Sequence, residues 1–176
     1  KDFFKPIIIN DKIKILPFWE EQSKDYLNII INPALAFGTG HHETTNMMIK
    51  AMLEFDYNNK STLDIGTGSG ILSILAKKKG ATKIAAIDND SLTCNNFYEN
   101  LSLNNLTKND MDFQIKDCFE IDNFNFDFIF ANINLGVLVR LIPKINNTDS
   151  ILIISGILDA DEKSLINLLN QNNKKI

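Results

Sequence analysis

The chain has 176 residues, of which 44% are hydrophobic and 23% charged, and its formal net charge is −4. This length fits one ordinary domain, and the hydrophobic content excludes a disordered or fibrous chain. Arg140 is the only arginine. Because phosphate and guanine recognition depends on arginine, we expect no direct nucleic-acid binding.

The chain shows no signal for membrane insertion or secretion. No apolar run reaches the length of a membrane span, and the first residues lack the apolar stretch of a signal peptide. Cys94 and Cys118 lie far apart, which favours two reduced thiols over a disulfide or a zinc site. We therefore expect a cytoplasmic monomer without membrane contact. The sequence does not begin with Met, which indicates a fragment of a longer protein.

The first third of the chain is extended in character. Residues 6–9, 12–16 and 27–31 are β-rich runs separated by polar turn residues. From residue 44 to 55 the apolar residues recur at helical spacing, which predicts a helix.

After residue 60 the predicted strands and helices alternate. Predicted strands span 61–65, 83–87, 112–115, 126–131 and 150–154, and predicted helices span 69–79, 91–103, 135–142 and 159–169. Strands that are apolar throughout belong to parallel sheets covered on both faces. The sequence thus predicts an α/β fold with a doubly wound, mostly parallel sheet, preceded by short N-terminal strands.

A glycine-rich segment, D-I-G-T-G-S-G at 64–70, follows the first of these strands and opens a helix. Its glycines permit positive φ and close approach of a ligand to the backbone, and the helix start offers free N–H groups. A dinucleotide-binding loop requires G-x-G-x-x-G, but here the third glycine comes one residue early and Ile71 stands in its place. A tight turn without a ligand is the alternative.

Asp88 follows the strand 83–87, where its carboxylate can accept hydrogen bonds from two ribose hydroxyls. An acidic strand end after a G-x-G-x-G turn favours S-adenosylmethionine over NAD, because that turn has no pyrophosphate to hold. The alternative is an ordinary carboxylate in a turn, since Asn89 and Asp90 are also turn residues.

A third motif, N-P-A-L-A-F-G-T-G-H-H-E-T-T at 32–45, is more specific than any glycine pattern. Together with 64–70 it resembles the ribosomal protein L11 methyltransferase family (PrmA), and the resemblance continues through 70–72, 87–90, 131–133 and 155–158. It implies a Rossmann-like class I methyltransferase fold and S-adenosyl-L-methionine as cofactor, with S-adenosyl-L-homocysteine as product. The implied reaction methylates amino groups of ribosomal protein L11, both lysine side chains and the N-terminal amine.

The resemblance also implies a set of site residues. Asn132, at the end of an apolar strand, would contact the cofactor and act in catalysis by orienting the incoming amine. The other implied cofactor-binding residues are Thr45, Gly66, Gly68 and Asp88, with Phe37 and Gly38 near the methionine end. Capping of the helix start is the alternative role for Thr44 or Thr45. No residue stands out as a general base, so we expect proximity and desolvation to dominate.

His41, His42 and Glu43 do not predict a metal site, because adjacent side chains diverge and no partner ligands occur at usable spacing. In the family, threonine is usual at position 41 and proline at position 43. His42 matches the residue of the family at this position. Two roles stay open for it: a structural role in capping or packing, and a catalytic role.

The resemblance divides the chain in two. Residues 1–31 correspond to a β segment that follows the family's linker and packs on a cofactor-binding catalytic domain, 32–176. We expect the family's N-terminal recognition domain and a C-terminal hairpin to be absent from this chain, and therefore weak or no activity on the ribosomal protein. Alternatives are a protein-lysine or small-molecule methyltransferase with another substrate, and a non-enzymatic cofactor-binding scaffold.

Overall fold

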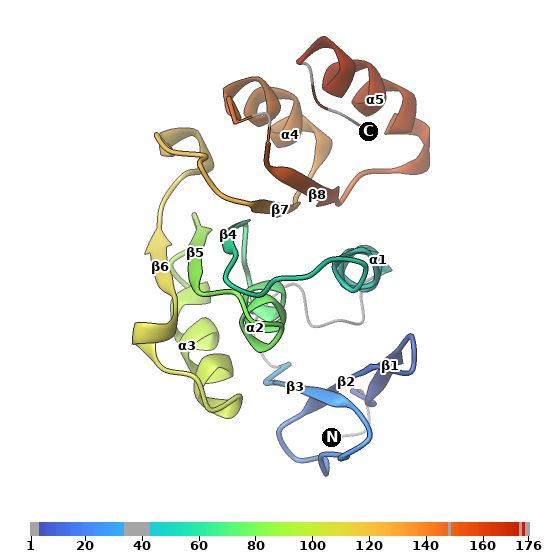
Figure 1. Cartoon of the computed structure of the whole chain (residues 1–176), viewed down its shortest axis with the longest axis vertical. Coiled ribbons are helices and arrows are strands. Elements are labelled where there is room, and N and C mark those ends of the chain that lie inside the picture. Colours follow the sequence, from blue (N-terminus) through green and yellow to red (C-terminus); the bar gives the residue numbers. More distant parts are fainter. Residues whose placement is uncertain (1–3, 34–42, 148, 173, 175–176) are drawn as a thin grey trace.

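The computed structural model describes residues 4–33, 43–147, 149–172 and 174. In these residues, five parallel strands form the main sheet in the order β6-β5-β4-β7-β8 (Figure 1). The strands are β4 (Ser61–Ile65), β5 (Lys83–Asp88), β6 (Asp112–Ile115), β7 (Phe128–Asn132) and β8 (Ile151–Ser155). The strand order reverses between β4 and β7, and ligands of such sheets bind at the carboxyl ends beside that reversal.

Helices cover both faces of this sheet. One face carries α1 (Glu43–Met52), α2 (Ile71–Lys78) and α3 (Thr93–Leu103), and the other carries α4 (Leu135–Leu141) and α5 (Glu162–Gln171) (Figure 1). Short 3₁₀ turns occupy Lys108–Asp110, Cys118–Glu120, Ile142–Lys144 and Asp159–Asp161. The predicted doubly wound α/β fold is confirmed. None of the helices described is long and apolar enough to cross a bilayer.

Strand β7 shows why the apolar run in the sequence is continuous. Phe128 and Phe130 pack into the core under α1, α2 and α3, whereas Ile129 and Ala131 pack into the core under α4 and α5. Successive side chains of a strand point to opposite faces, so a strand covered on both sides needs apolar residues at every position.

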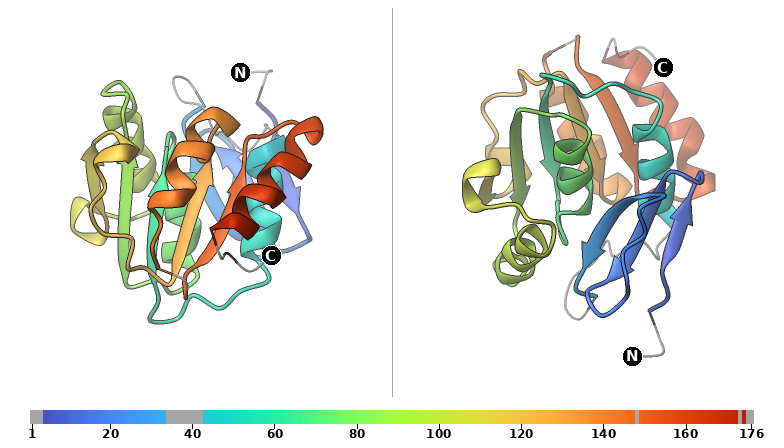
Figure 2. Two further views of the ribbon diagram at one scale, coloured as in Figure 1. Left: turned by 90° about the horizontal axis from the view of Figure 1, so that it is seen from above. Right: turned by 60° about the horizontal axis from the view of Figure 1, so that its bottom comes forward.

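The N-terminal strands form a separate small sheet. In it, β1 (Ile7–Ile9) runs antiparallel to β2 (Ile13–Pro17), which runs parallel to β3 (Leu27–Ile31). Five of its isoleucines share one buried cluster with Met48 of α1 and Ile74 of α2, so this sheet forms an outer layer over the helices (Figure 2). They are Ile9, Ile13, Ile15, Ile29 and Ile31. The predicted N-terminal strands are confirmed, and a domain division after residue 31 stays a prediction.

Each helix differs from its predicted bounds by one to three residues at one or both ends, and α2 and α4 show the physical reasons. The α2 helix was expected to begin at Ser69 but begins at Ile71, because Gly68 and Gly70 have φ values of 53° and 80° and hold the chain in a turn. The α4 helix ends at Leu141, one residue early, and Pro143 lies in the 3₁₀ turn that follows. Proline at that place cannot donate the backbone hydrogen bond that a longer helix would need.

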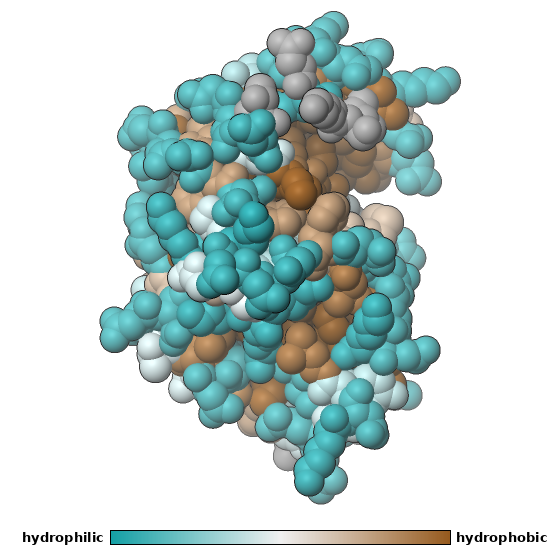
Figure 3. Space-filling model, in the orientation of Figure 1, coloured by the Kyte–Doolittle hydropathy of each residue, from teal (hydrophilic) through white to brown (hydrophobic). Residues whose placement is uncertain are grey.

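An apolar groove of about 400 Å³ lies between α1 and the edge strand β8. Met47, Met48 and Ala51 line one side, and Ile153 and Ile154 line the other. Figure 3 shows hydrophobic residues gathered in the hollow over these two elements. This groove is distinct from the larger cavity at the carboxyl ends of the strands, although Ile157 and Leu158 belong to both walls.

Candidate functional site

A cavity of about 800 Å³ opens at the carboxyl ends of the parallel strands. This volume lies within the range of small-molecule and cofactor sites. The wall is formed by residues that follow or end each strand, together with the start of α1: Ile65, Gly66, Ile87, Asp88, Asn89, Lys116, Cys118, Asn132, Ile133, Asn134, Val137, Gly156, Ile157, Leu158, Glu43 and Thr44. The strand order and the start of α1 therefore bring residues from six separate stretches of sequence to one site.

The glycine-rich turn between β4 and α2 is held against β5. The N–H groups of Gly66 and Thr67 both donate to the carbonyl oxygen of Ile87, at 2.9 and 3.0 Å. Gly66 has a φ of 71°, and a Cβ atom there would lie 2.7 Å from the Cγ2 atom of Ile133. This position therefore requires glycine both for its backbone conformation and for the space beside it.

Asp88 is the last residue of β5 and lines the cavity. Its Oδ2 atom accepts the N–H of Gly68 at 2.8 Å, and its Oδ1 atom accepts the N–H of Asp90 at 3.0 Å. A carboxylate oxygen can accept about two hydrogen bonds, so each oxygen keeps capacity for a hydroxyl donor. Asp88 thus orders the glycine-rich turn and still presents acceptors to the cavity.

Asn132 is the last residue of β7, and its side chain bridges to α1. The Nδ2 atom donates to the Oγ1 atom of Thr45 at 3.2 Å. The Oδ1 atom of Asn132 is buried and has no hydrogen-bond partner in the described part of the chain. A buried acceptor without a partner is costly, and this one belongs to a residue of the cavity wall. It is therefore available to a donor on a ligand.

The predicted site residues take different places in this arrangement. Gly66, Asp88 and Asn132 lie together on the cavity wall. Thr45 is buried behind Asn132, and Gly68 reaches the wall through its bond to Asp88. The roles of these five residues stay predictions, and Phe37 and Gly38 lie outside the described residues.

Asp64, under the glycine-rich turn, is a buried carboxyl that the sequence did not single out. Its Oδ2 atom accepts the hydroxyls of Thr67 and Ser73, each at 2.7 Å. Burial raises the pKa of Asp64 to about 6, and these two hydrogen bonds oppose that rise. The side chain thus fixes the turn from below, and its ionisation has a cost that depends on pH.

Two further wall residues, Ile133 and Gly156, were missed as site residues. The N–H of Ile133 donates to the carbonyl oxygen of Ser155 at 3.2 Å, and Gly156 has a φ of 87°. A Cβ atom at Gly156 would lie 2.6 Å from the backbone oxygen of Ile133. For Gly156 the signal in the sequence was a glycine two residues after the last predicted strand, at the edge where ligands bind.

The sequence predicts no metal site at residues 41–43, and the structure describes one of these three residues. His41 and His42 lie outside the described residues. Glu43 is the first residue of α1 and lines the cavity. Across the residues that the structure describes, no group of three or more His, Cys, Asp or Glu side chains could hold a metal ion.

Comparison with known proteins identifies the family. The sequence model described as ribosomal protein L11 methyltransferase (PrmA) matches residues 1–175. The chain belongs to this family. Of its solved structures, the ribosomal protein L11 methylase of Lactobacillus delbrueckii subsp. bulgaricus superposes with a TM-score of 0.87 and 32% identity, covering 96% of this chain and 89% of that one.

Curated relatives with the same family name are longer than this chain. The ribosomal protein L11 methyltransferase of Prochlorococcus marinus (strain MIT 9515) is 38% identical over 186 residues, which cover all of this chain and 62% of the relative. That of Porphyromonas gingivalis is 44% identical over 141 residues, 79% of this chain and 48% of the relative. This PrmA chain therefore spans about half to three fifths of the relatives that it matches.

Proposed function

We propose that this PrmA chain binds S-adenosylmethionine and carries the catalytic site of an enzyme that methylates amino groups of ribosomal protein L11. The observation that carries the proposal is the convergence of Gly66, Asp88 and Asn132 on one cavity wall. Family membership supports the substrate, because the matching relatives are named for it. We place the protein in the cytoplasm, as a monomer.

The residues of the cavity fit this cofactor. Asp88 offers acceptors for the two ribose hydroxyls, and Gly66 leaves the backbone open to close approach. Lys116 and Cys118 follow β6 on the same side of the cavity as Asp88, and Ile87 adds an apolar surface for a base. Asn132, Ile133 and Gly156 form another part of the wall, and we assign this part to the reactive group of the cofactor.

The cofactor supplies a sulfonium methyl group of high intrinsic reactivity. The protein must then align an amine with it and exclude water. A lysine amine has an ordinary pKa of about 10.4, so only roughly one in a thousand is neutral at pH 7. Transfer into the cavity favours the neutral amine, because burial disfavours the charged form.

Asn132 is the residue that we assign to orientation of the amine. Its Nδ2 atom is committed to Thr45, which leaves the Oδ1 atom to accept an N–H of the amine. The nitrogen lone pair would then point away from Asn132, toward the methyl group. Asn132→Ala in the full-length parent should lower turnover at saturating cofactor, and near-normal turnover would contradict this role.

The test of the overall function is the intact mass of purified ribosomal protein L11 after incubation with S-adenosylmethionine and either the longer Prochlorococcus marinus relative or this chain. We expect mass increments of one methylene per transfer, fewer of them with the 176-residue chain alone, because substrate recognition is proposed to lie in the remaining length of the relatives. If the mass is unchanged with both proteins while calorimetry shows cofactor binding, the assignment as a methyltransferase stands but ribosomal protein L11 is not its substrate.

A further inference from the structure

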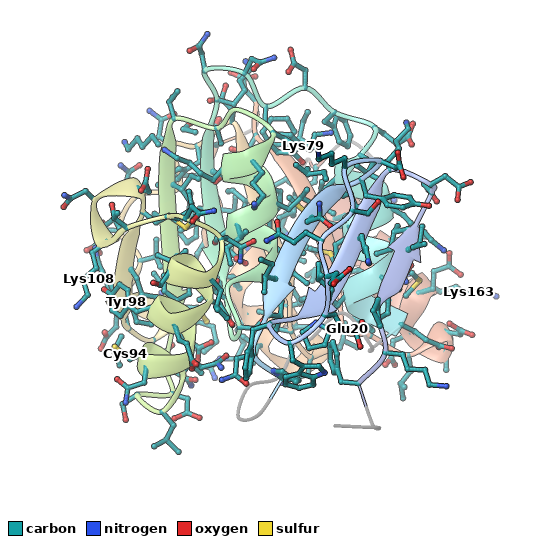
Figure 4. All side chains as sticks on the ribbon, turned by 90° about the horizontal axis from the view of Figure 1, so that it is seen from below. Glu20, Lys79, Cys94, Tyr98, Lys108 and Lys163 are labelled. Atoms are coloured by element: carbon teal, nitrogen blue, oxygen red, sulfur yellow. The ribbon has the colours of Figure 1, made fainter. Side chains whose placement is uncertain are left out.

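Three asparagines form one buried stripe along α3 and its C-terminal cap, which is Asn104. Asn96, Asn100 and Asn104 are four residues apart, so they lie above one another on the same helix face. Their exposed fractions are 3%, 0% and 4%. Figure 4 shows Cys94 and Tyr98 on the side of α3 that is turned away from β3. The asparagine stripe faces the opposite way, toward β3.

The side chains of this stripe bond to the backbone at the edge of β3 that faces away from β2, where a further strand could otherwise pair. Asn104 accepts the N–H of Ile30 at 3.0 Å and donates to the carbonyl oxygen of Ile30 at 2.7 Å. Two residues further on, the N–H of Asn32 donates to Asn100 at 2.8 Å, and Asn96 donates to the carbonyl oxygen of Asn32 at 3.2 Å. Side-chain amides thus satisfy the backbone groups that another strand would otherwise pair.

Asn100 differs from the other two because it also reaches the glycine-rich turn. Its Nδ2 atom donates to the carbonyl oxygen of Ser69 at 2.8 Å and to the Oδ1 atom of Asn96 at 3.1 Å. Together with the bond from Asn32, these contacts use both donors and an acceptor of a fully buried amide. Ser69 lies between Gly68 and Gly70, inside the turn.

We propose that Asn100 is a positioning residue of the cofactor site, which locks the glycine-rich turn to the strand that leads into residues 34–42. Asn100 is not part of the cavity wall, so it acts through the two segments that it joins. One of them contains Gly66, and the other continues directly from Asn32 into the motif 32–45. The inference rests on the proposed binding of S-adenosylmethionine.

The chain offers a matched control in Asn104. It is buried on the same helix face, and within the part of the chain that the structure describes its side-chain amide bonds to Ile30 and to the carbonyl oxygen of Asn100 but not to the turn. Asn100→Asp and Asn104→Asp each keep the side-chain shape and remove two N–H donors. In Asn100→Asp a carboxyl oxygen then faces the carbonyl oxygen of Ser69, which repels it.

The experiment compares both variants with the wild-type 176-residue chain. Calorimetry with S-adenosylhomocysteine should show about tenfold weaker binding for Asn100→Asp and a change within about twofold for Asn104→Asp. Amide hydrogen exchange without ligand should be faster at residues 66–71 in Asn100→Asp only. Equal affinities and equal exchange in the two variants would overturn the proposal, because loss of helix stability alone affects both.

The same experiment separates this inference from the proposed function. If the wild-type chain does not bind S-adenosylhomocysteine, the proposed cofactor is wrong, and the exchange at 66–71 still tests the role of Asn100. If Asn100→Asp does not fold, hydrogen exchange in the wild-type chain with and without S-adenosylhomocysteine tests the proposal instead. Ligand should then slow exchange at the N–H of Asn32 more than at the N–H of Ile30, and equal slowing would overturn the proposal.

Discussion

The side-chain amide of Asn132, at the end of β7, donates to the hydroxyl of Thr45 on α1 at 3.2 Å, across 87 positions of sequence. This bond orients the amide, since the Nδ2 atom lies toward Thr45 and the Oδ1 atom is left without a partner in the described residues. Thr45 is 1% exposed, so the hydroxyl is fixed by its surroundings. The resemblance to the family marked both residues, and the structure adds the relation between them.

Removal of the Thr45 hydroxyl should weaken cofactor binding through Asn132. Thr45→Val keeps the shape of the side chain but offers no acceptor, so the part-buried Nδ2 atom of Asn132 loses its partner at a cost of about 1 kcal/mol. We expect roughly tenfold weaker binding of S-adenosylhomocysteine by calorimetry. Thr45→Ser, which keeps the hydroxyl, is the control.

A double-mutant cycle with Asn132→Ala identifies the route of this effect. If Thr45 acts by orienting Asn132, Thr45→Val should have little further effect once Asn132 is alanine. Additive losses would instead indicate that each residue contacts the cofactor independently.

The fold was predictable because its signals are local. Strands such as β7 are apolar at every position before the last residue, and Gly68 and Gly70 mark the turn before α2. The asparagine stripe was not predictable in this way, because asparagine is abundant throughout the chain and the bonds from Asn100 and Asn104 to β3 span 68 to 74 positions. Only the packing of α3 against β3 distinguishes these asparagines from exposed ones.

The two cavity glycines should differ in whether a second substitution rescues them. Gly66→Ala brings a Cβ atom to 2.7 Å from the Cγ2 atom of Ile133, a side-chain atom, whereas Gly156→Ala brings one to 2.6 Å from the backbone of Ile133. Both also carry positive φ, which costs a non-glycine residue about 1–2 kcal/mol. Ile133→Ala removes the first clash but leaves the second.

Urea denaturation of the single and double variants measures this difference. Stability lost in Gly66→Ala should be partly restored in the background of Ile133→Ala, and stability lost in Gly156→Ala should not be. Equal rescue of both glycine variants would show that the backbone near Ile133 moves freely, contrary to the rigid contact described above.

The titration of Asp64, taken by itself, should make the protein more stable at pH 5 than at pH 7. Burial raises its pKa to about 6, above the ordinary value of an unfolded aspartate. Between those two values the folded state binds more protons than the unfolded state, so stability falls as pH rises through this window and is constant above it. For this group alone the loss from pH 5 to pH 7 is about 1 kcal/mol.

Asp64→Asn removes that titration while keeping an acceptor for Thr67 and Ser73. The wild-type chain and the variant are compared by urea denaturation at pH 5 and pH 7. We expect the wild-type chain to lose about 1 kcal/mol more than the variant between the two pH values. An identical pH dependence in both proteins would mean that Asp64 is ionised at pH 5 in the folded state.

Asp127 lies before β7, at the opposite end of the sheet from the cavity, and should affect stability without affecting the ligand. Its Oδ2 atom accepts the N–H of Ser61 at 2.8 Å and the hydroxyl of Ser61 at 2.7 Å, and the Ser61 hydroxyl accepts the N–H of Asp127 at 3.0 Å. Bonds from Ser61 are the main cause that lowers the pKa of Asp127 to about 2.

Asp127→Ala removes the acceptor that joins the beginnings of β4 and β7. We expect a loss of about 1–2 kcal/mol of stability at pH 7, measured by urea denaturation, because a backbone N–H and a hydroxyl lose a charged acceptor. Part of this loss should already appear in the wild-type chain as pH falls from about 4 toward 2, where the carboxylate is protonated. Affinity for S-adenosylhomocysteine, measured where both proteins are folded, should stay unchanged. A weaker affinity in Asp127→Ala would show that the two ends of the sheet are coupled. A loss of stability alone could then also weaken binding in the Asn100 and Thr45 variants.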